Sequence, residues 1–394
     1  MTAADSQHGP LHGVRVLDLS TVIMGPMATQ ILGDLGADVI CIEEPKGNTN
    51  RVMGPGPERQ LSGVALNVLR NKRNVCLDLK TAEGRDAALR IAATCDVMVT
   101  NLRPGPLTRL GLAYEDVRAV KPDIVFCQAQ GWPSDSARAA DPAYDDIMQA
   151  ATGIADAFTK QSGRPHMAPT LVADKVSGLT IAYAVLAALF HRERTGEGQR
   201  LEVPMSEAVS AFTLVEHGAA AVAVPPQGPA GYPRILTPMR RPQQTADGWI
   251  SVLPYSRANY DALFRAGGRD DLADDPRLAD EGSRIMNAGF FYEGIEAVMP
   301  QRTTAEWLVF CEKEGIPASA VRTLDELIEE CPVTQHPTAG AYHQVPPPVR
   351  FDRTPASVRR HAPHIGEHTD EVLREVGIDD DAVAAMRDSK AIPR

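Results

Sequence analysis

The stretch that decides the fold is VRVLDLSTVIMGPMATQILGDLGADVICIEE, residues 14–44. Two apolar bursts, Val14–Leu19 and Val39–Glu43, enclose an amphipathic stretch, Pro26–Leu35, which Gly36 follows. A proline in the first turn and a glycine after the last are typical of a helix. The order strand, helix, strand predicts a β-α-β unit of a parallel sheet.

The same alternation continues to Gln128. Further strands are expected at Val75–Leu79, Val97–Thr100 and Ile124–Gln128, and a helix that Thr81 caps is expected at Glu83–Thr94. The sequence therefore predicts an α/β protein with a doubly wound core. Ligands of such sheets bind at the carboxyl ends of the strands. The first β-α turn lies there, but it lacks the G-x-G-x-x-G pattern of dinucleotide enzymes.

The rest of the chain divides into further units. A long helix at Leu179–Arg194, a strand at Arg200–Val203 and a helix at Ser206–Val222 precede a Pro- and Gly-rich linker at 225–233. We expect a large domain over 1–224, a smaller α/β domain with its linker over 225–330, and a return segment, 331–394, that completes the large domain. In the later parts we expect a strand at Trp249–Leu253 and helices at Ala258–Ala266, Met286–Met299, Thr304–Glu314 and Gly366–Val376.

Composition narrows the class of protein. With 40 Lys+Arg against 51 Asp+Glu the net charge is −11, which argues against a general affinity for nucleic acid or anionic membranes, so any phosphate site must be local. The six cysteines contain no C-x-x-C pair, as expected of reduced thiols in a cytoplasmic protein. The start of the chain is polar, and the longest uncharged apolar run, Leu179–Phe190, is shorter than the roughly 20 residues that span a bilayer. We expect a cytoplasmic protein that is not bound to a membrane.

Asp174 stands where an approach segment, Ala168–Ala173, gives way to a long apolar run, Val176–Phe190. An aspartate there is expected to cap the following helix, and backbone N–H groups at the helix start would favour its ionised form. Capping alone is the commoner role of such an aspartate. An ionised carboxylate at a helix start is also a candidate nucleophile.

The segment LVADKVSG, residues 171–178, the helix behind it, the turn TGEGQ at 195–199 and the strand after it resemble the active-site segment of the class III coenzyme A transferases, the formyl-CoA and carnitine types among them. The resemblance covers Leu11 to about Gly377. It implies a Rossmann-like large domain built from both chain ends, a smaller α/β domain and an interlocked homodimer. It also implies an acyl-CoA and a small carboxylic acid as substrates, no tightly bound cofactor, and Asp174 as the nucleophile.

The same resemblance implies residues that contact coenzyme A. The coenzyme carries a diphosphate and a 3′-phosphate, which need cationic partners. Arg109 is expected on a phosphate and Lys46 near the adenine, whereas Lys72 and Arg73 are expected as solvated surface charges unless they too meet phosphate. The implied coenzyme contacts are Ile23, Met24, Lys46, Leu77, Lys80, Asn101, Leu102, Arg103, Arg109 and Tyr144.

A second activity in the same family stays open, that of the α-methylacyl-CoA racemases. Those isomerases carry His-Asp-Ile where this chain has Asp145-Asp146-Ile147. Moving a proton between the two faces of an α-carbon needs two acid/base groups, and a histidine is the usual partner near pH 7. A transferase needs no such histidine, because a carboxylate attacks a thioester directly. A protein that binds coenzyme A without activity is the third alternative.

Two other groups of residues are expected to have no role in chemistry. His361, His364 and His368 could suggest a metal, but Pro363 and Gly366 interrupt a helical spacing and no cysteine is near in sequence, so no metal is expected. Three arginines that could meet a second carboxylate of a substrate are expected on the surface, namely Arg51, Arg240 and Arg241.

Overall fold

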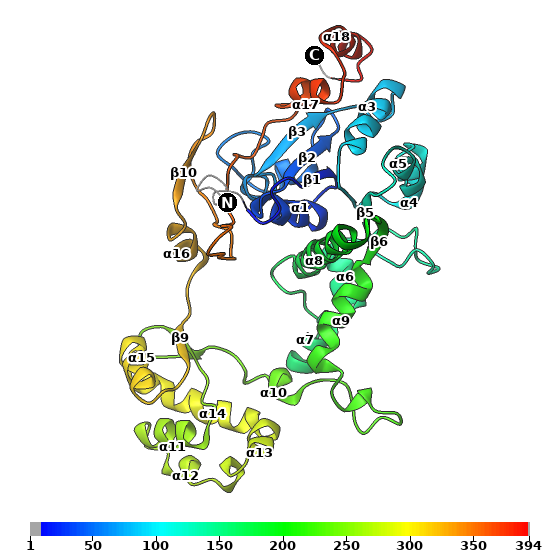
Figure 1. The fold of residues 1–394 in the computed structure, drawn as a ribbon. Helices are drawn as coiled ribbons and strands as arrows, with labels where there is room; N and C mark the ends of the chain where they lie inside the picture. Colours follow the sequence, from blue (N-terminus) through cyan, green and yellow to red (C-terminus); the bar gives the residue numbers. More distant parts are fainter. Residues whose placement is uncertain (1–8, 393–394) are drawn as a thin grey trace. The chain divides into compact units, whose positions relative to one another are not determined.

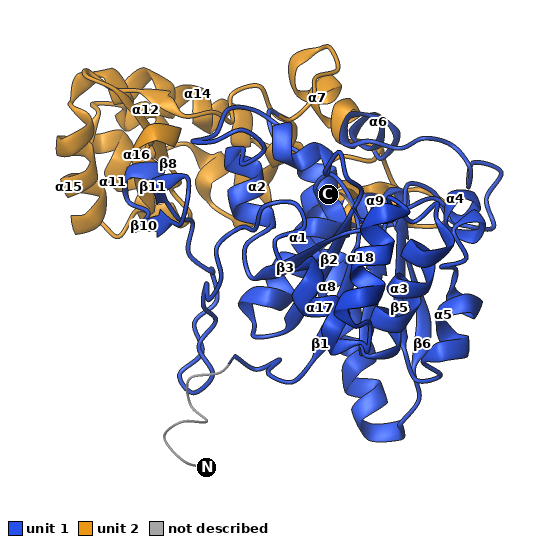
Figure 2. Ribbon diagram, turned by 90° about the horizontal axis from the view of Figure 1, so that it is seen from above, with its two compact units in different colours: residues 1–152, 169–212, 328–394 blue, residues 153–168, 213–327 orange. Residues whose placement is uncertain are grey.

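The computed structural model describes residues 9–392. They form two compact units, coloured separately in Figure 2. Unit 1 takes the residues up to 152, residues 169–212 and those from 328 on, and unit 2 takes residues 153–168 and 213–327.

The unit boundaries differ from those expected from the sequence. The chain changes units at 212/213 and 327/328, where the sequence analysis placed boundaries at 224/225 and 330/331. The segment 153–168, which had been assigned to the large domain, belongs to unit 2. Its helix α7 (Ile154–Ser162) packs against α10 (Pro233–Leu236), a contact between distant parts of the chain that local composition does not reveal.

Unit 1 is built on a six-stranded parallel sheet in the order β3-β2-β1-β4-β5-β6 (Figure 1). This is the strand order of a Rossmann fold, in which the order reverses between β1 and β4. The strands are β1 (Arg15–Leu19), β2 (Asp38–Glu43), β3 (Lys72–Cys76), β4 (Val97–Thr100), β5 (Val125–Gln130) and β6 (Gln199–Pro204). The predicted α/β class with a parallel sheet is confirmed.

Helices cover both faces of this sheet. On one face α1 (Met24–Asp34) packs against α8 (Val172–Thr195), and α8 also contacts β5 and β6. On the other face Leu17, Ile40 and Phe126 of the strands share a core with α3 (Ala82–Ala93), α5 (Tyr114–Val120), α17 (Thr369–Glu375) and α18 (Asp380–Asp388). The remaining elements of unit 1 are α2 (Gly63–Val68), α4 (Pro104–Arg109), α6 (Asp145–Ala151), the first part of α9 (Met205–His217), β10 (Val333–His336) and β11 (Gly340–His343).

Strand β3 begins earlier than expected, at Lys72 rather than Val75. Its charged residues are buried because they have partners. Lys72 Nζ lies 2.8 Å from Asp18 Oδ2, with both side chains fully buried, and Arg73 pairs with Asp38, Glu371 and Glu375. The expectation of solvated cations at Lys72 and Arg73 was therefore wrong.

Helix α8 also begins earlier than expected, at Val172 rather than Leu179. With 24 residues it is long and apolar enough to cross a membrane by length and composition, and half of its most apolar window is buried. The core helix of a water-soluble protein satisfies the same criteria. One side of α8 packs against α1, α6, β5 and β6 in unit 1, whereas Leu179, Tyr183 and Phe190 are exposed.

Gly178 permits the close packing of α8 on α1. A Cβ atom at this position would lie 2.9 Å from the carbonyl oxygen of Met24, closer than a carbon atom can approach without displacement. Alanine is favoured over glycine within a helix by about 1 kcal/mol. Nevertheless we expect Gly178→Ala to destabilise the protein by about 1–3 kcal/mol, because the two helices must move apart.

Thermal and denaturant unfolding measure this effect. Gly63→Ala is the matched control, because the nearest atom to its Cβ would be 3.8 Å away. A Gly178→Ala protein as stable as this control would contradict the packing described here.

Unit 2 contains a small antiparallel sheet and several helices. The sheet has the order β7-β8-β9, with β7 (Gln243–Gln244), β8 (Trp249–Val252) and β9 (Ala318–Ala320). Its core contains Phe264, Phe291 and Trp307. The main helices, α11 (Arg257–Ala266), α14 (Ala288–Val298) and α15 (Thr304–Lys313), lie close to their predicted bounds, with α12 (Asp270–Ala273) and α13 (Glu281–Met286) between them, and α16 (Leu324–Glu329) spans the change back to unit 1.

Candidate active site

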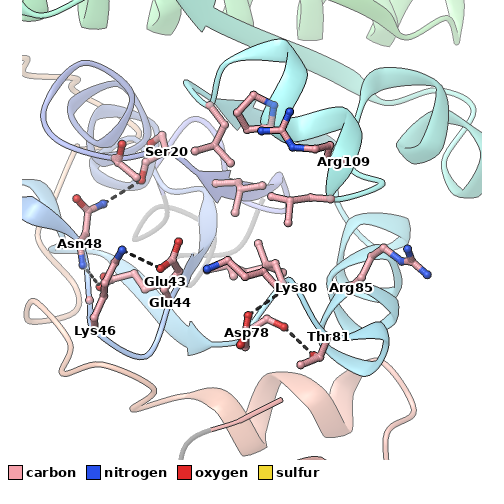
Figure 3. Close-up of a pocket in the computed structure, with 18 of the residues that line it drawn as sticks. Ser20, Glu43, Glu44, Lys46, Asn48, Asp78, Lys80, Thr81, Arg85 and Arg109 are labelled. Carbon is pink, nitrogen blue, oxygen red and sulfur yellow. Dashed lines mark hydrogen bonds and ion pairs between the residues drawn. The ribbon is translucent and has the colours of Figure 1, made fainter. Parts of the chain in front are cut away.

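A cavity of about 670 Å³ opens in unit 1 where the strands end (Figure 3). Three of its lining residues lie at strand ends: Leu19 is the last residue of β1, Glu43 is the last residue of β2, and Leu102 follows β4. The cavity therefore lies at the point where the strand order reverses, the usual ligand site of a doubly wound sheet. Its volume is in the range of small-molecule and cofactor sites.

Four cationic side chains line the cavity: Lys46, Lys80, Arg85 and Arg109. Lys46 pairs with Glu44 at 3.0 Å. Within residues 9–392, the side chains of Lys80, Arg85 and Arg109 have no carboxylate partner. These three cations are therefore available to an anionic ligand such as a phosphate.

Of the residues expected at the coenzyme, Lys46, Lys80, Leu102 and Arg109 line the cavity together. Arg85 lines it too, although the sequence analysis did not select it. It is part of the first turns of α3, directly after the cap Thr81 that the sequence did reveal.

The other residues expected to contact coenzyme A do not line the cavity. Asn101 supports that wall, since its Nδ2 donates to Thr21 O and its Oδ1 accepts from Thr21 N, both at 2.8 Å. Leu77 is fully buried in the core of unit 1. Ile23 and Met24 are buried at the start of α1.

Two expected contacts are exposed. Arg103 donates to the carbonyl oxygen of Ala140 at 3.2 Å. Tyr144 is 64% exposed and directly precedes α6.

Glu43, which lines the cavity, is held by a buried ion pair with Arg51. Arg51 donates to both carboxylate oxygens of Glu43, at 2.7 and 2.8 Å, and its Nη1 donates to Pro363 O at 3.0 Å. Glu43 also accepts the N–H of Asn48 at 2.9 Å. Arg51 is therefore buried, so the expectation of a surface position was wrong, and Glu43 is held by protein groups.

Asp174 lies in the first turn of α8, but it does not cap the helix. The residue at the cap position is Leu171. The Asp174 side chain is 8% exposed, and its backbone N–H donates to Asp145 Oδ1 at 3.0 Å. Asp145 is itself buried, and its Oδ2 accepts from Gln149 Nε2 at 2.6 Å. The cap group of this helix is thus a carboxylate from α6.

Burial, together with the nearby charge of Asp145, raises the pKa of Asp174 to about 7. The expectation that the helix start would favour the ionised form was wrong, because the carboxylate is removed from water beside a second acid. A carboxyl group that titrates near neutral pH is typical of a functional site. At neutral pH Asp174 is present in both forms.

The polar groups around Asp174 are largely occupied. The Asp174 N–H binds Asp145, and the Val172 N–H donates to Thr170 O at 2.8 Å. Ser177, one turn further along the same side of α8, is fully buried, and its hydroxyl has no partner among the described residues. Near Asp174, this hydroxyl is therefore a buried hydrogen-bond donor that no described protein group uses.

Asp145 is not among the functional residues predicted from the sequence, in which the segment Asp145-Asp146-Ile147 is informative only through the histidine that it lacks. The signal that could have revealed Asp145 is its place at the start of a helix in a segment that resembles the family. The pairing with Asp174, 29 residues away, requires the fold.

The fold and the cavity define a Rossmann-type α/β protein with a coenzyme-sized site at the strand ends. The model of the protein family described as CoA-transferase family III matches residues 11–369 of this chain. The chain therefore belongs to CoA-transferase family III, and the predicted resemblance and enzyme class are confirmed.

Similar proteins agree with this assignment. The chain is 31% identical to a mouse succinyl-CoA:glutarate CoA-transferase, over 93% of this chain and 86% of the relative. It is 31% identical to a probable fatty acyl-CoA transferase of Mycobacterium tuberculosis, over 91% of this chain and 96% of the relative. A crystal structure of a CAIB/BAIF family protein from Brucella suis superposes with a TM-score of 0.79 at 26% identity, covering 94% of this chain and all of that one.

Proposed function

We propose that the protein moves coenzyme A from an acyl-CoA donor to a carboxylic acid acceptor, with Asp174 as the covalent relay. The observation that carries the proposal is the buried Asp174 carboxyl group in the first turn of α8, whose backbone N–H binds Asp145; although its pKa is raised to about 7, part of it is ionised at neutral pH. The resemblance places the nucleophile of this family at the same residue. An ionised carboxylate needs no general base to attack a thioester.

The first half of the reaction loads the enzyme. The Asp174 carboxylate attacks the acyl carbon of the donor, which forms a mixed anhydride and releases the coenzyme A thiolate. The thiolate then attacks the aspartyl carbonyl carbon of the anhydride. This step forms an aspartyl-CoA thioester and releases the donor acid as a carboxylate. The relay replaces one difficult exchange by easier steps.

The second half reverses the chemistry on the acceptor. The acceptor carboxylate attacks the aspartyl thioester, which forms a new mixed anhydride and frees the thiolate again. The thiolate attacks the acyl carbon of the acceptor, giving acceptor-CoA and the Asp174 carboxylate. Each tetrahedral intermediate needs a hydrogen-bond donor for its oxyanion, and the unpartnered hydroxyl of Ser177 is our candidate.

The cavity would hold the coenzyme as a substrate, with no tightly bound cofactor. Lys80, Arg85 and Arg109 would neutralise its phosphates, and the two turns that carry Thr21 and Leu102 would contact the rest. As the resemblance implies, we also propose that the enzyme is an interlocked homodimer and acts in the cytoplasm.

A substrate panel tests the proposed activity. The purified protein is incubated with pairs of one acyl-CoA and one carboxylic acid, and the formation of the second acyl-CoA is followed by chromatography. The proposal predicts that at least one pair exchanges coenzyme A with equal amounts of donor consumed and product formed. Exchange with none of a broad panel of mono- and dicarboxylic acids would contradict it.

The isomerase alternative is tested in the same preparation. Without an acceptor acid in deuterium oxide, a racemase would exchange the α-proton of an α-methylacyl-CoA. We expect no such exchange, because Asp145 stands where racemases of the family carry a histidine. No observation in this chain favours the isomerase.

The pH dependence follows from the pKa of Asp174. Because a protonated carboxyl group does not attack a thioester, kcat/KM should fall as the pH decreases through about 7. Asp145→Asn keeps an oxygen that accepts the Asp174 N–H but removes the negative charge. In this variant the fall of kcat/KM on the acidic side of the pH profile should therefore occur at lower pH.

Initial rates between pH 5 and 9 measure the shift. Asp146→Asn, an exposed neighbour on the same helix, is the control and should leave the profile unchanged. An Asp145→Asn profile identical to that of the unmodified protein would refute the role of Asp145 in raising the pKa of Asp174.

Arg109→Ala tests the site for coenzyme phosphate. A charge-assisted hydrogen bond contributes roughly 1.5–3 kcal/mol, so the KM for acyl-CoA should rise about tenfold or more while kcat changes little. Arg118→Ala is the control, since Arg118 does not line the cavity. The effect should shrink with a donor that lacks the nucleotide, such as an acyl-pantetheine. Equal KM values in the two variants would place the phosphates elsewhere.

A further inference from the structure

Three potential metal ligands from distant segments meet in unit 1, away from the cavity. They are Glu58, His336 at the end of β10, and His364 in the return segment. One ligand atom of each lies within 4.8 Å of the others. The sequence predicts no metal at His361, His364 and His368, because Pro363 and Gly366 interrupt a helical ligand spacing. The fold instead brings one of these histidines, His364, to His336 and Glu58, which lie far away along the chain.

His336 is held in the form that binds a metal. Its side chain is almost fully buried, and its Nε2 lies 2.9 Å from the carbonyl oxygen of Ala362. Because a carbonyl oxygen only accepts, Nε2 carries the proton and the lone pair is on Nδ1. A backbone carbonyl that orients the second ring nitrogen is the usual support of a metal-bound histidine.

The lone pair of His336 Nδ1 makes only long bonds. The N–H groups of Thr338 and Ala339 donate to it at 3.3 and 3.2 Å, longer than the common 2.9–3.0 Å. A metal ion would replace these two bonds by a stronger one. The Thr338 hydroxyl also lies 3.3 Å from Nδ1.

The other two ligands face each other across the same hydroxyl. His364 Nε2 lies 3.9 Å from Glu58 Oε2, and Thr338 Oγ1 is 2.8 Å from each of them. The backbone N–H of His364 is fixed by Glu367 at 2.8 Å. Ligand atoms around a tetrahedral zinc ion are about 3.4 Å apart. The three side chains therefore need only a small closure and a rotation of Thr338.

We propose that Glu58, His336 and His364 bind one zinc ion, through a carboxylate oxygen, Nδ1 and Nε2 respectively, with water as the fourth ligand. Two histidines and a glutamate form an established ligand set for Zn²⁺. Charge supports the choice, because the glutamate offsets part of the charge of the ion and both histidines bind in the neutral form.

Although the zinc site is not part of the cavity, the ion would stabilise the cavity wall indirectly, through Pro363 and Arg51. His364 directly follows Pro363, whose carbonyl oxygen binds Arg51, and Arg51 holds the cavity residue Glu43. The ion would join the loop of Glu58 to the return segment that carries these contacts. Its role is thus structural, and it takes no part in the transfer of coenzyme A.

Zinc binding to the full-length protein, freed of any affinity tag and stripped with a chelator, tests the proposal. Isothermal titration and metal analysis after gel filtration should give one Zn²⁺ per chain. Glu58→Gln and His364→Gln should each weaken binding by about tenfold or more. Both residues are partly exposed, so these variants should fold, which circular dichroism verifies.

His343→Gln is the matched control, because His343 lies on the neighbouring strand β11 outside the ligand group and should leave zinc affinity unchanged. Zinc should also raise the melting temperature of the unmodified protein and of the control, but not that of His364→Gln. Absence of stoichiometric binding, or equal affinity in all variants, would overturn the proposal. Neither outcome depends on transferase activity.

Discussion

Replacing Asp174 with asparagine is expected to lower kcat by about 10⁴-fold or more, because an amide is not a nucleophile toward a thioester. The substitution changes little else. Asparagine has nearly the same shape, and the contact with Asp145 uses the backbone N–H, which remains. The cavity residues that would bind coenzyme A are untouched.

Steady-state transfer and equilibrium binding of coenzyme A are measured side by side. The variant should bind coenzyme A with unchanged affinity and unfold at or above the temperature of the unmodified protein, since it no longer buries an ionisable group. Asp146→Asn serves as the control for an exposed aspartate. Transfer at more than a tenth of the normal rate in Asp174→Asn would remove Asp174 from the mechanism.

Replacing Lys72 with methionine is expected to cost about 3–5 kcal/mol of stability, a large part of the total for most proteins. Lys72 Nζ donates to Asp18 Oδ2 at 2.8 Å, Thr29 Oγ1 at 2.7 Å and Pro26 O at 2.9 Å, and it is fully buried. Without it, the charge of Asp18 stays buried with only neutral partners.

Thermal and denaturant unfolding measure this loss. Lys46→Met is the control, because the Lys46 side chain is 79% exposed and should tolerate the change. The double variant Asp18→Asn with Lys72→Met should recover part of the loss, since it leaves no unpaired charge in the core. If Lys72→Met alone is as stable as the control, the ion pair does not hold this part of the fold together.

The sheet could be predicted because its strands are nearly continuous apolar runs, as parallel strands buried on both faces are. Strand β3 was misplaced for the opposite reason. Its first residues are charged, and they become buried only through partners far along the chain, 54 residues away for Lys72 and 302 for Arg73. No local pattern contains that information.

The candidate site shows the same division. Asp174, Lys80 and Arg109 could be selected from a resemblance in single segments, and the latter two line one cavity. The protonation state of Asp174 could not be predicted from the sequence, because its pKa depends on burial and on the charge of Asp145. The group of Glu58, His336 and His364 could not be predicted, because its three residues lie far apart in the sequence and meet only in the fold.

The central claim is that Asp174 becomes covalently acylated during turnover. The most direct measurement is to quench the enzyme in mid-reaction with hydroxylamine, digest it, and locate the modified residue by mass spectrometry. The account predicts a hydroxamate at Asp174 that appears only with an acyl-CoA present and is absent from Asp174→Asn. Product that accumulates while the peptide carrying Asp174 stays unmodified in every quenched sample would contradict it.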